Sequence, residues 1–505
     1  MSAGASAPSL TRDTVSGLRW TYGATALSTL AQLGYSAVMG RLLSPADFGL
    51  VAAAAVFLRF GGYFAEMGVG SAVVQRPTLS RDEVRTSFTS AVLLGALFAM
   101  SVALAAPLAA RVFSPQVVAP IRWLALSLLV NGLGVTARGL LRRSMRFRAV
   151  AVVDVASYLI GYLAVGAGFA LAGAGVWSLV AASLGQSLVA AAAAYALARH
   201  AVAPRFDRRE LTGLYAFGGR ISVISFGEFL AASLDTFVVG AVAGVSDLGQ
   251  YNRALLLVNL PLDRAAFGMA DVLFPAFSRA AERRAQLRRA YLGATRVAAA
   301  LLVPLGAGIA VAAPELVDVL LGAQWTVAAR LVPLVVVAAV ASVLALFPAV
   351  MCEAVAVLDA KLGLVSVHLA GLAGLLALAR GRGLMALAGA VAFAGVVRLL
   401  LYLLLMRRVL GVGLGEHLAV YLPALAAGAA TAVAVAVAGA GVRQLGAPTA
   451  LVLAGQVTCG AVALVTALLA GPLVAARREI HRVLGDAGLF DGVGAWRSRA
   501  DRLLR

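Results

Sequence analysis

The chain has 505 residues, of which 62% are hydrophobic and only 13% carry a charged side chain. Its mean hydropathy is +0.93, so it holds far more apolar side chains than a water-soluble fold of this length can bury. The composition predicts a polytopic membrane protein. It leaves no segment for a large domain outside the bilayer, which excludes soluble enzymes, nucleic-acid-binding proteins and pumps that carry their own ATP-driven motor.

Apolar runs bounded by charged residues, Pro and Gly predict fourteen transmembrane helices after a polar N-terminal tail. The first eight are expected near residues 17–39, 48–70, 87–110, 117–137, 149–171, 175–198, 214–239 and 249–275. The last six are expected near residues 292–313, 327–350, 354–379, 384–406, 417–440 and 449–474. The predicted fold class is therefore all-α.

The basic residues between these helices predict the orientation of the chain. All but one of the 42 basic residues are arginine. If the N-terminus is cytoplasmic, 30 of the 42 fall on the inner side and seven on the outer side. Positive charge accumulates in cytoplasmic loops, so we expect a bacterial inner (plasma) membrane protein with both termini in the cytoplasm. The net charge of +19 is then mainly a signal of topology.

A short motif recurs 200 residues along the chain, as VMGRLLSPADFG at 38–49 and VVGAVAGVSDLG at 238–249. The shared residues are Gly40, Asp47 and Gly49 in the first copy and Gly240, Asp247 and Gly249 in the second. The repeat predicts two pseudo-symmetric lobes of six helices with two helices added at the end. The expected boundaries are an N-terminal tail at 1–16, an N-lobe at 17–198, an inter-lobe linker at 199–213, a C-lobe at 214–406, two further helices within 407–476 and a basic cytoplasmic tail at 477–505.

Several long segments resemble polysaccharide flippases of the MOP superfamily. The second-helix region reads FLRFGGYFAEMGVGSAVVQRPTLSRDEVRTSFTSAVLLG, and a later stretch contains GLLRRSMRFRA and GAGVWSLV. The latter two are similar to the branch that includes colanic-acid and teichuronic-acid exporters, as is DTFVVGAVAGVSDLGQYNRALLLVNLPLDRAAFGMADVLFPAFSRA. This resemblance implies transport of a polyprenyl-diphosphate-linked oligosaccharide from the inner to the outer leaflet by alternating access, without ATP, cofactor or enzymatic chemistry.

Ionisable residues inside membrane helices are costly, so each is a candidate for the substrate site. FLRFGGYFAE is similar to a segment of lipid II flippases whose helix-2 arginine lines a cationic cavity, which implies that Arg59 contacts the diphosphate. Arg264 and Arg253 in the eighth helix are further candidates, because a planar guanidinium binds phosphate oxygens in pairs. Arg19 and Arg220 are expected at the cytoplasmic mouth. The alternatives are ion pairing inside the bundle and ordinary positive-inside anchoring.

The acidic residues of the predicted helices are candidates for ion coupling or for pairing within the cavity, because a buried carboxyl group can exchange a proton or bind a cation. They are Glu66, Asp154, Glu228, Asp235 and Asp271. Structural pairing of these carboxylates with nearby arginines is the alternative. No pattern in the sequence predicts a metal site.

Other functions stay open at this stage. Within transport, they are a flippase for the peptidoglycan precursor lipid II and a multidrug or cation antiporter of the same superfamily. The alternative of another class is a membrane glycan polymerase or an assembly scaffold, although the longest predicted outer segment, 314–326, is only about a dozen residues. The expected partners are the lipid-linked glycan, membrane lipids and glycan polymerase or export machinery, and nucleic acid is not among them.

Overall fold

The computed structural model describes residues 7–65, 73, 79–205, 219–280 and 284–479, with side chains except at 7–22, 63–65, 219–225, 264–280 and 470. Within these residues the chain is helical and contains no strand, which confirms the predicted fold class. The chain divides into two compact units. Unit 1 comprises residues 1–253, 320–327 and 380–384, and unit 2 comprises 254–319, 328–379 and 385–505.

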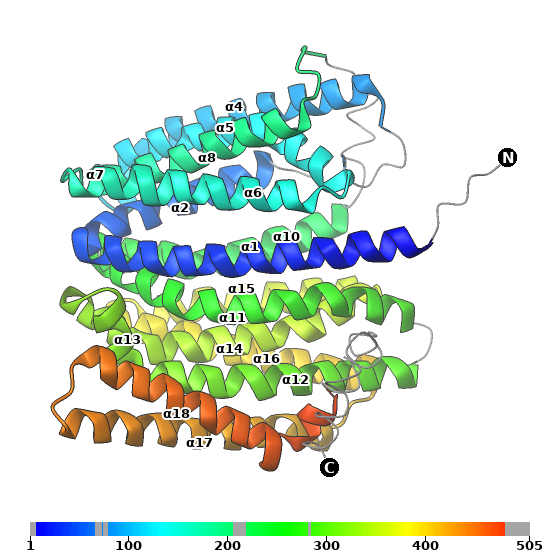
Figure 1. Ribbon diagram of the computed structural model, residues 1–505, viewed down its shortest axis with the longest axis vertical. Coiled ribbons are helices and arrows are strands. Elements are labelled where there is room, and N and C mark those ends of the chain that lie inside the picture. Colours follow the sequence, from blue (N-terminus) through cyan, green and yellow to red (C-terminus); the bar gives the residue numbers. More distant parts are fainter. Residues whose placement is uncertain (1–6, 66–72, 74–78, 206–218, 281–283, 480–505) are drawn as a thin grey trace. The chain divides into compact units, whose positions relative to one another are not determined.

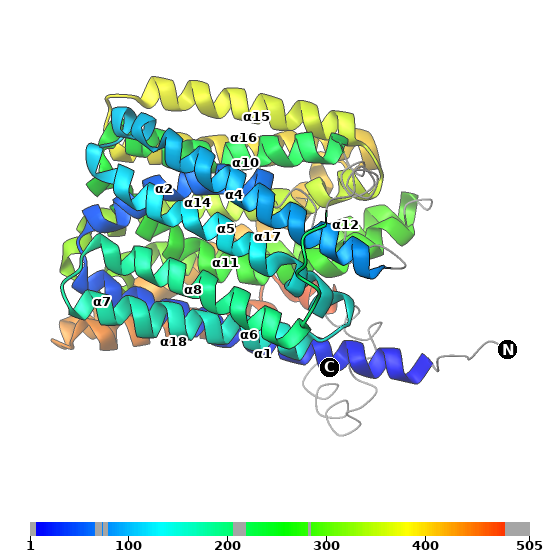
Figure 2. The ribbon, with the colours of Figure 1, turned by 90° about the horizontal axis from the view of Figure 1, so that it is seen from above.

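Unit 1 contains the helices of the N-terminal half. They are α1 (Ala7–Leu42), α2 (Pro45–Ala65), α4 (Arg81–Val112), η1 (Pro115–Val117), α5 (Val118–Arg143), α6 (Phe147–Tyr158), the π-helix η2 (Leu159–Gly166), α7 (Ala167–Leu171), α8 (Val176–Ala198), α10 (Gly219–Ala243) and the first turns of α11 (Val245–Ala280). Helices α4, α5 and α8 lie side by side in this unit (Figures 1 and 2). The short helix η3 (Ala323–Trp325) also belongs to it.

Unit 2 contains the rest of α11 and the C-terminal helices. They are α12 (Arg284–Val311), α13 (Ala313–Leu320), α14 (Thr326–Ala354), α15 (Leu358–Ala379), α16 (Leu384–Leu410), α17 (Leu414–Gln444) and α18 (Thr449–Ala470). Helix α17 packs against both α12 and α18 (Figure 1). The segment 314–326, expected as an outer loop, contains α13 and η3 instead. Its apolar residues Val317 and Trp325 are buried, and this burial stabilises the short helices.

Twelve of the described helical segments are long and apolar enough to cross a membrane. Many of their large apolar side chains are exposed, including Leu104 at 72% and Leu171 at 75%. Such an apolar surface is stable in lipid and not in water. The chain is therefore a multi-pass membrane protein. The expected first and eighth crossings correspond to α1 and α11, which are not among the twelve, so a total of fourteen stays a prediction.

The repeated motif lies where α1 turns into α2 and where α10 turns into α11. At the first turn, Ser44 and Asp47 form reciprocal hydrogen bonds: the Ser44 N–H donates to Asp47 Oδ2 at 3.0 Å and the Asp47 N–H donates to Ser44 Oγ at 3.3 Å. These bonds satisfy backbone donors that a helix start leaves free. The shared aspartate thus has a structural explanation as a helix-capping residue of α2.

The repeated glycines mark close helix packing inside unit 1. A Cβ atom at Gly49 would lie 1.6 Å from the Val245 carbonyl oxygen, and one at Gly249 would lie 1.8 Å from the Pro45 carbonyl oxygen. The backbones of the first turns of α2 and α11 are therefore in contact. The contact is nearly symmetric, because Gly49 meets the Val245 carbonyl as Gly249 meets the Pro45 carbonyl. Only glycine leaves room for it.

Candidate functional site

Arg253, on α11, lies partly buried in unit 1 among polar and aromatic groups. Its Nη1 donates to Ser36 Oγ at 3.4 Å and its Nη2 donates to Asn252 Oδ1 at 3.1 Å. The guanidinium carbon lies 4.2 Å from the centre of the Phe48 ring, which is a cation–π contact. Nε is buried and has no hydrogen-bond partner among the described residues.

Three tyrosines from α1, α6 and η2 lie beside this guanidinium. The rings of Tyr35 and Tyr162 meet edge to face with centres 4.9 Å apart, and those of Tyr158 and Tyr162 stack at 4.7 Å. All three side chains interact electrostatically with Arg253. The Tyr35 hydroxyl is buried without a hydrogen-bond partner in the described part of the chain. We call Arg253 with Tyr35, Tyr158, Tyr162 and Phe48 the Arg253 site.

The π-helix η2 helps to shape this site because it carries Tyr162, and π-helical turns are frequent at functional sites. Two glycines let η2 approach its neighbours closely. A Cβ atom at Gly161 would lie 2.4 Å from the Gln186 backbone nitrogen, and one at Gly166 would lie 3.0 Å from the Tyr35 hydroxyl oxygen. The local sequence therefore brings an irregular helix against the side of α1 that carries Tyr35.

No carboxylate forms an ion pair with Arg253 within the residues that the structure describes. Tyrosine hydroxyls, an amide oxygen and an aromatic face stabilise a cation, but none of them neutralises it. A charge inside a membrane protein is costly unless it is paired or lines a wet cavity. An anion that reached the guanidinium would therefore be bound favourably.

Asp235, on α10, is joined to α11 by a hydrogen bond. The Tyr251 hydroxyl donates to Asp235 Oδ2 at 2.7 Å, and the Thr236 N–H donates to Asp235 Oδ1 at 2.6 Å. Asp235 and Tyr251 are both buried, and Asp235 also interacts electrostatically with Arg59. The carboxylate thus has its own partners in α10 and α11, and Arg59 itself is exposed.

Of the predicted residues, Asp235 interacts electrostatically with Arg59 and is hydrogen-bonded to Tyr251, two residues before Arg253 on α11. Asp154 pairs with Arg138 at 3.2 Å, as the structural alternative predicted, and Glu228 is half-buried on α10. Glu66 lies outside the described residues, as do the side chains of Arg19, Arg220, Arg264 and Asp271.

Sequence reasoning missed the aromatic members of the site. Tyr158 and Tyr162 are four residues apart in the run SYLIGYL, a spacing that places both on one side of a helix. That signal existed, but apolar packing of a membrane helix produces the same pattern. No sequence pattern identifies Phe48 as a member of the site, since its contact with Arg253 joins residues about 200 positions apart.

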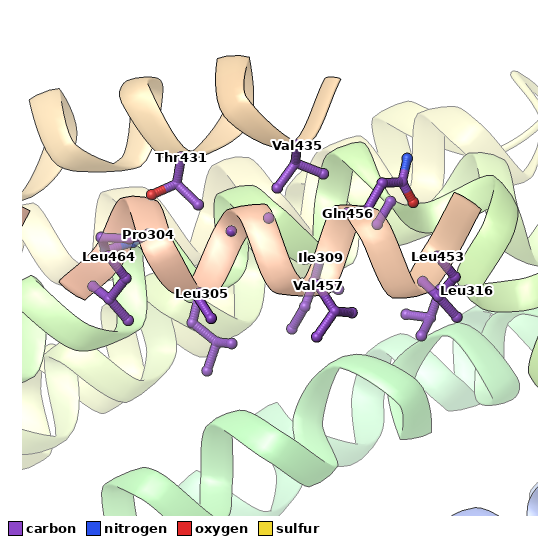
Figure 3. Close-up of a pocket in the computed structure, with 14 residues that line it drawn as sticks. Pro304, Leu305, Ile309, Leu316, Thr431, Val435, Leu453, Gln456, Val457 and Leu464 are labelled. Atoms are coloured by element: carbon purple, nitrogen blue, oxygen red, sulfur yellow. The ribbon is translucent and has the colours of Figure 1, made fainter. Parts of the chain in front are cut away.

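Unit 2 contains an apolar cavity of about 250 Å³ between α12, α13, α17 and α18 (Figure 3). Leu305, Ile309, Val435 and Leu464 are among the side chains that line it. A space of this size with an apolar lining can bind an apolar ligand, since about 150 Å³ is already sufficient for benzene. The cavity is suited to hydrocarbon and not to a charged group.

A polar cluster lies at one end of this cavity. Gln456 lines the cavity and donates from Nε2 to Glu315 Oε2 at 3.3 Å, while Arg443 Nη1 donates to Glu315 Oε1 at 2.5 Å. Glu315 is buried, so its charge depends on these two donors. The cluster joins α13, α17 and α18 and fixes one end of the cavity wall.

The sequence matches a family of polysaccharide biosynthesis proteins. A family described as "Polysaccharide biosynthesis protein" matches residues 38–330. The succinoglycan biosynthesis transport protein ExoT of Rhizobium meliloti (strain 1021) is 28% identical over 289 residues, 57% of this chain and 58% of the relative. The lipopolysaccharide biosynthesis protein WzxC of Escherichia coli (strain K12) is 24% identical over 324 residues, 63% of this chain and 65% of the relative. These matches span less than two thirds of either relative.

Comparison with solved structures agrees on the fold. The lipid II flippase MurJ in an inward closed conformation aligns with a TM-score of 0.69 at 11% identity, over 89% of this chain and 97% of the other. An inward-facing multidrug resistance transporter of the MATE family, MOP superfamily, aligns with a TM-score of 0.57 at 16% identity, over 77% of this chain and 94% of the other. The chain thus has the fold of MOP-superfamily transporters.

Proposed function

The chain belongs to the family of polysaccharide biosynthesis proteins, and we propose that it is a flippase for a polyprenyl-diphosphate-linked oligosaccharide. It would move this lipid from the inner to the outer leaflet of the bacterial plasma membrane by alternating access. The names of ExoT and WzxC, which refer to succinoglycan transport and to lipopolysaccharide biosynthesis, support export of a glycan. The polytopic fold supports transport through the membrane and not chemistry at its surface.

The observation that carries this proposal is the cationic Arg253 site. A diphosphate has at least two negative charges and many acceptor oxygens, and the guanidinium has a free donor and no carboxylate partner within the described residues. Arg59, exposed on α2, supplies a second positive charge on the same unit. We assign the diphosphate to Arg253, with Arg59 as a second candidate contact.

The apolar part of the substrate requires a different environment. The cavity in unit 2 is lined by aliphatic side chains and has the volume of a short stretch of hydrocarbon. We infer that this cavity of unit 2 binds a hydrocarbon chain of a membrane lipid. The glycan, by contrast, requires water and hydrogen-bonding groups, and the tyrosine hydroxyls of the Arg253 site are suited to its first sugar.

The orientation follows from the charges of the loops. Arginines are concentrated at the ends of helices expected to face the cytoplasm, for example Arg142 and Arg143 at the end of α5 and Arg407 and Arg408 at the end of α16. Both termini are then cytoplasmic. The proposed partners are the lipid-linked glycan, membrane lipids and the machinery that polymerises or exports the glycan.

A cation antiporter of the same superfamily is a weaker alternative. An antiporter that expels organic cations needs unpaired carboxylates, and Asp235 is already hydrogen-bonded by Tyr251 and Thr236. A lipid II flippase would use the same diphosphate chemistry and differ only in the glycan. A glycan polymerase or a scaffold is disfavoured because the outer segment around α13 and η3 is largely packed into helices.

Transport in proteoliposomes tests this function. A polyprenyl-diphosphate oligosaccharide is placed in both leaflets, and the fraction that an external glycosidase can reach over time is measured for wild type, Arg59→Ala, Arg253→Ala and Arg122→Ala. Arg122 is an exposed arginine on α5 and serves as the matched control for lost charge. We expect at least a tenfold lower rate for Arg253→Ala and wild-type rates for Arg122→Ala.

Each other outcome has a meaning. Full transport by folded Arg253→Ala protein would refute the assignment of the diphosphate. Absence of transport by the wild type, together with export of a fluorescent organic cation, would favour the antiporter. Transport of lipid II at the same rate as the oligosaccharide would favour the peptidoglycan precursor as substrate.

A further inference from the structure

The short helix η3 binds the end of α1 through two side-chain donors. Trp325 Nε1 donates to the Gly40 carbonyl at 2.8 Å, and Gln324 Nε2 donates to the carbonyls of Gly40 at 2.6 Å and Leu43 at 3.1 Å. Trp325 is completely buried. The last carbonyls of a helix have no partner within the helix, so η3 supplies donors that the end of α1 lacks.

The same segment contacts α2 and α11. The Trp325 and Phe48 rings meet edge to face with centres 5.4 Å apart, and Gln250 Nε2 donates to the Gln324 carbonyl at 2.9 Å. Phe48 in turn lies under the guanidinium of Arg253 at 4.2 Å. A continuous chain of contacts therefore joins η3 to the Arg253 site, entirely within unit 1.

We propose that Gln324 and Trp325 form a latch that closes the outer side of the Arg253 site by holding the α1–α2 turn against α11, so that both are positioning residues for transport. The proposal rests on the proposed function for the need to alternate access and for naming this end the outer one. Gln324 and Trp325 do not contact the diphosphate in the proposed function. Their role is to close the site. Alternation requires the latch to release.

The chemistry of the latch suits reversible closure. Its bonds to Gly40 and Leu43 end on backbone carbonyls at a helix terminus, which water can satisfy as soon as the turn moves away. Opening therefore exchanges three protein hydrogen bonds for bonds to water and does not strand a buried polar group. A latch built on a buried ion pair would leave uncompensated charges when it opened.

The internal repeat shows what the latch adds. Gly240, the repeat partner of Gly40, would place a Cβ atom 2.4 Å from the Phe113 ring, just as a Cβ at Gly40 would lie 2.9 Å from the Leu321 side chain. The helix after Phe113 is η1 (Pro115–Val117), as η3 follows Leu321. Where η3 has Trp325, η1 ends in Val117, whose side chain has no donor. The two turns share packing, and the hydrogen-bonding indole is specific to η3.

Thiol labelling of intact cells tests the latch without any substrate. In a background with Cys352→Ala and Cys459→Ala, a cysteine replaces Ser36, which is 2% exposed and contacts Arg253. A membrane-impermeant maleimide is applied from outside, and its rate of reaction is measured with and without Trp325→Ala and Gln324→Ala. We expect the double variant with Trp325→Ala and Gln324→Ala to be labelled at least ten times faster than the protein with neither change. Trp325→Phe keeps an aromatic ring but loses the N–H donor, so its labelling rate should lie between those two.

Two reference cysteines make the result decisive. Gln116→Cys is exposed in η1 and should react rapidly in every variant, whereas Ser178→Cys, fully buried at the start of α8, should react slowly in every variant. An unchanged rate at Ser36→Cys would overturn the latch. Acceleration at Ser178→Cys as well would also overturn it, because the residues would then maintain the fold and not the closure. If Gln116→Cys fails to react from outside, the orientation with η1 on the outer side is refuted. If the glycan is not transported in proteoliposomes, only the proposed function is refuted.

Discussion

Replacing Gly49 by alanine should open the outer end of unit 1. The new Cβ atom would lie 1.6 Å from the Val245 carbonyl oxygen, whereas carbon and oxygen in close contact are about 3.3 Å apart. The first turns of α2 and α11 must then separate by about 1.7 Å. Both sides of this contact are backbone, so no rotamer change can relieve it.

The size of the effect follows from this geometry. Overpacking costs typically 1–3 kcal/mol, and a clash between two backbones falls at about 3 kcal/mol, the upper end of that range. At about 1.4 kcal/mol for each factor of ten, the balance between closed and open outer ends shifts roughly 100-fold toward open. Gly249→Ala, whose Cβ would lie 1.8 Å from the Pro45 carbonyl oxygen, should have the same effect. The double variant should add little, because both changes break one contact.

The assay is the labelling rate of Ser36→Cys, combined with thermal unfolding of the purified protein. Gly34→Ala on α1 is the control, since a Cβ atom there meets nothing within 4 Å. It should stabilise the helix by about 0.5–1 kcal/mol and leave labelling unchanged. Folded Gly49→Ala and Gly249→Ala proteins that label as slowly as Gly34→Ala would refute the inferred closure at this contact.

Three further predictions concern the polar pairs and the cavity. Tyr251→Phe should lower stability by about 1–3 kcal/mol through loss of the hydrogen bond to buried Asp235, and should cost measurably less in an Asp235→Asn background in a double-mutant cycle of thermal unfolding. Arg443→Ala should lower stability by about 1–3 kcal/mol because it removes a donor from buried Glu315, and equal unfolding midpoints of variant and wild type would contradict this. Gly308→Leu, which fills the cavity of unit 2, should leave the unfolding midpoint within a few degrees of wild type and lower the amount of lipid that copurifies with the protein. Unchanged bound lipid would contradict a lipid chain in this cavity.

The helical architecture could be read from the sequence because it depends on features that are local along the chain. Runs of about 20 apolar residues predict crossings whatever their neighbours are, and Gly40 and Gly49 recur at a fixed spacing. The ends of helices were less predictable. The segment 314–326 has the length of a loop, but Val317 and Trp325 find buried positions that only the folded unit provides.

The site was only partly predictable for a related reason. A charged residue in an apolar run, such as Arg253 or Arg59, can be identified from sequence as a candidate site residue, because placing a charge in the membrane costs free energy. Tyr35, Tyr158 and Phe48 carry no such cost and look like ordinary membrane-helix residues. Their role depends on which helices meet, and that information lies in contacts between distant parts of the chain.

In the proposed mechanism, Phe48 couples closure to anion binding. It precedes Gly49, so it belongs to the turn of α2 that lies against α11 by backbone contact. Its ring faces Trp325 on the latch and the guanidinium of Arg253 at the site. Movement of α2 away from α11 therefore removes the aromatic face from the cation at the same moment that it opens a path to the outside. The cation then gains water, and the higher local dielectric constant weakens its attraction for a bound diphosphate. A substrate bound while the latch is closed would thus be released by the movement that opens the latch, and no separate release step is required.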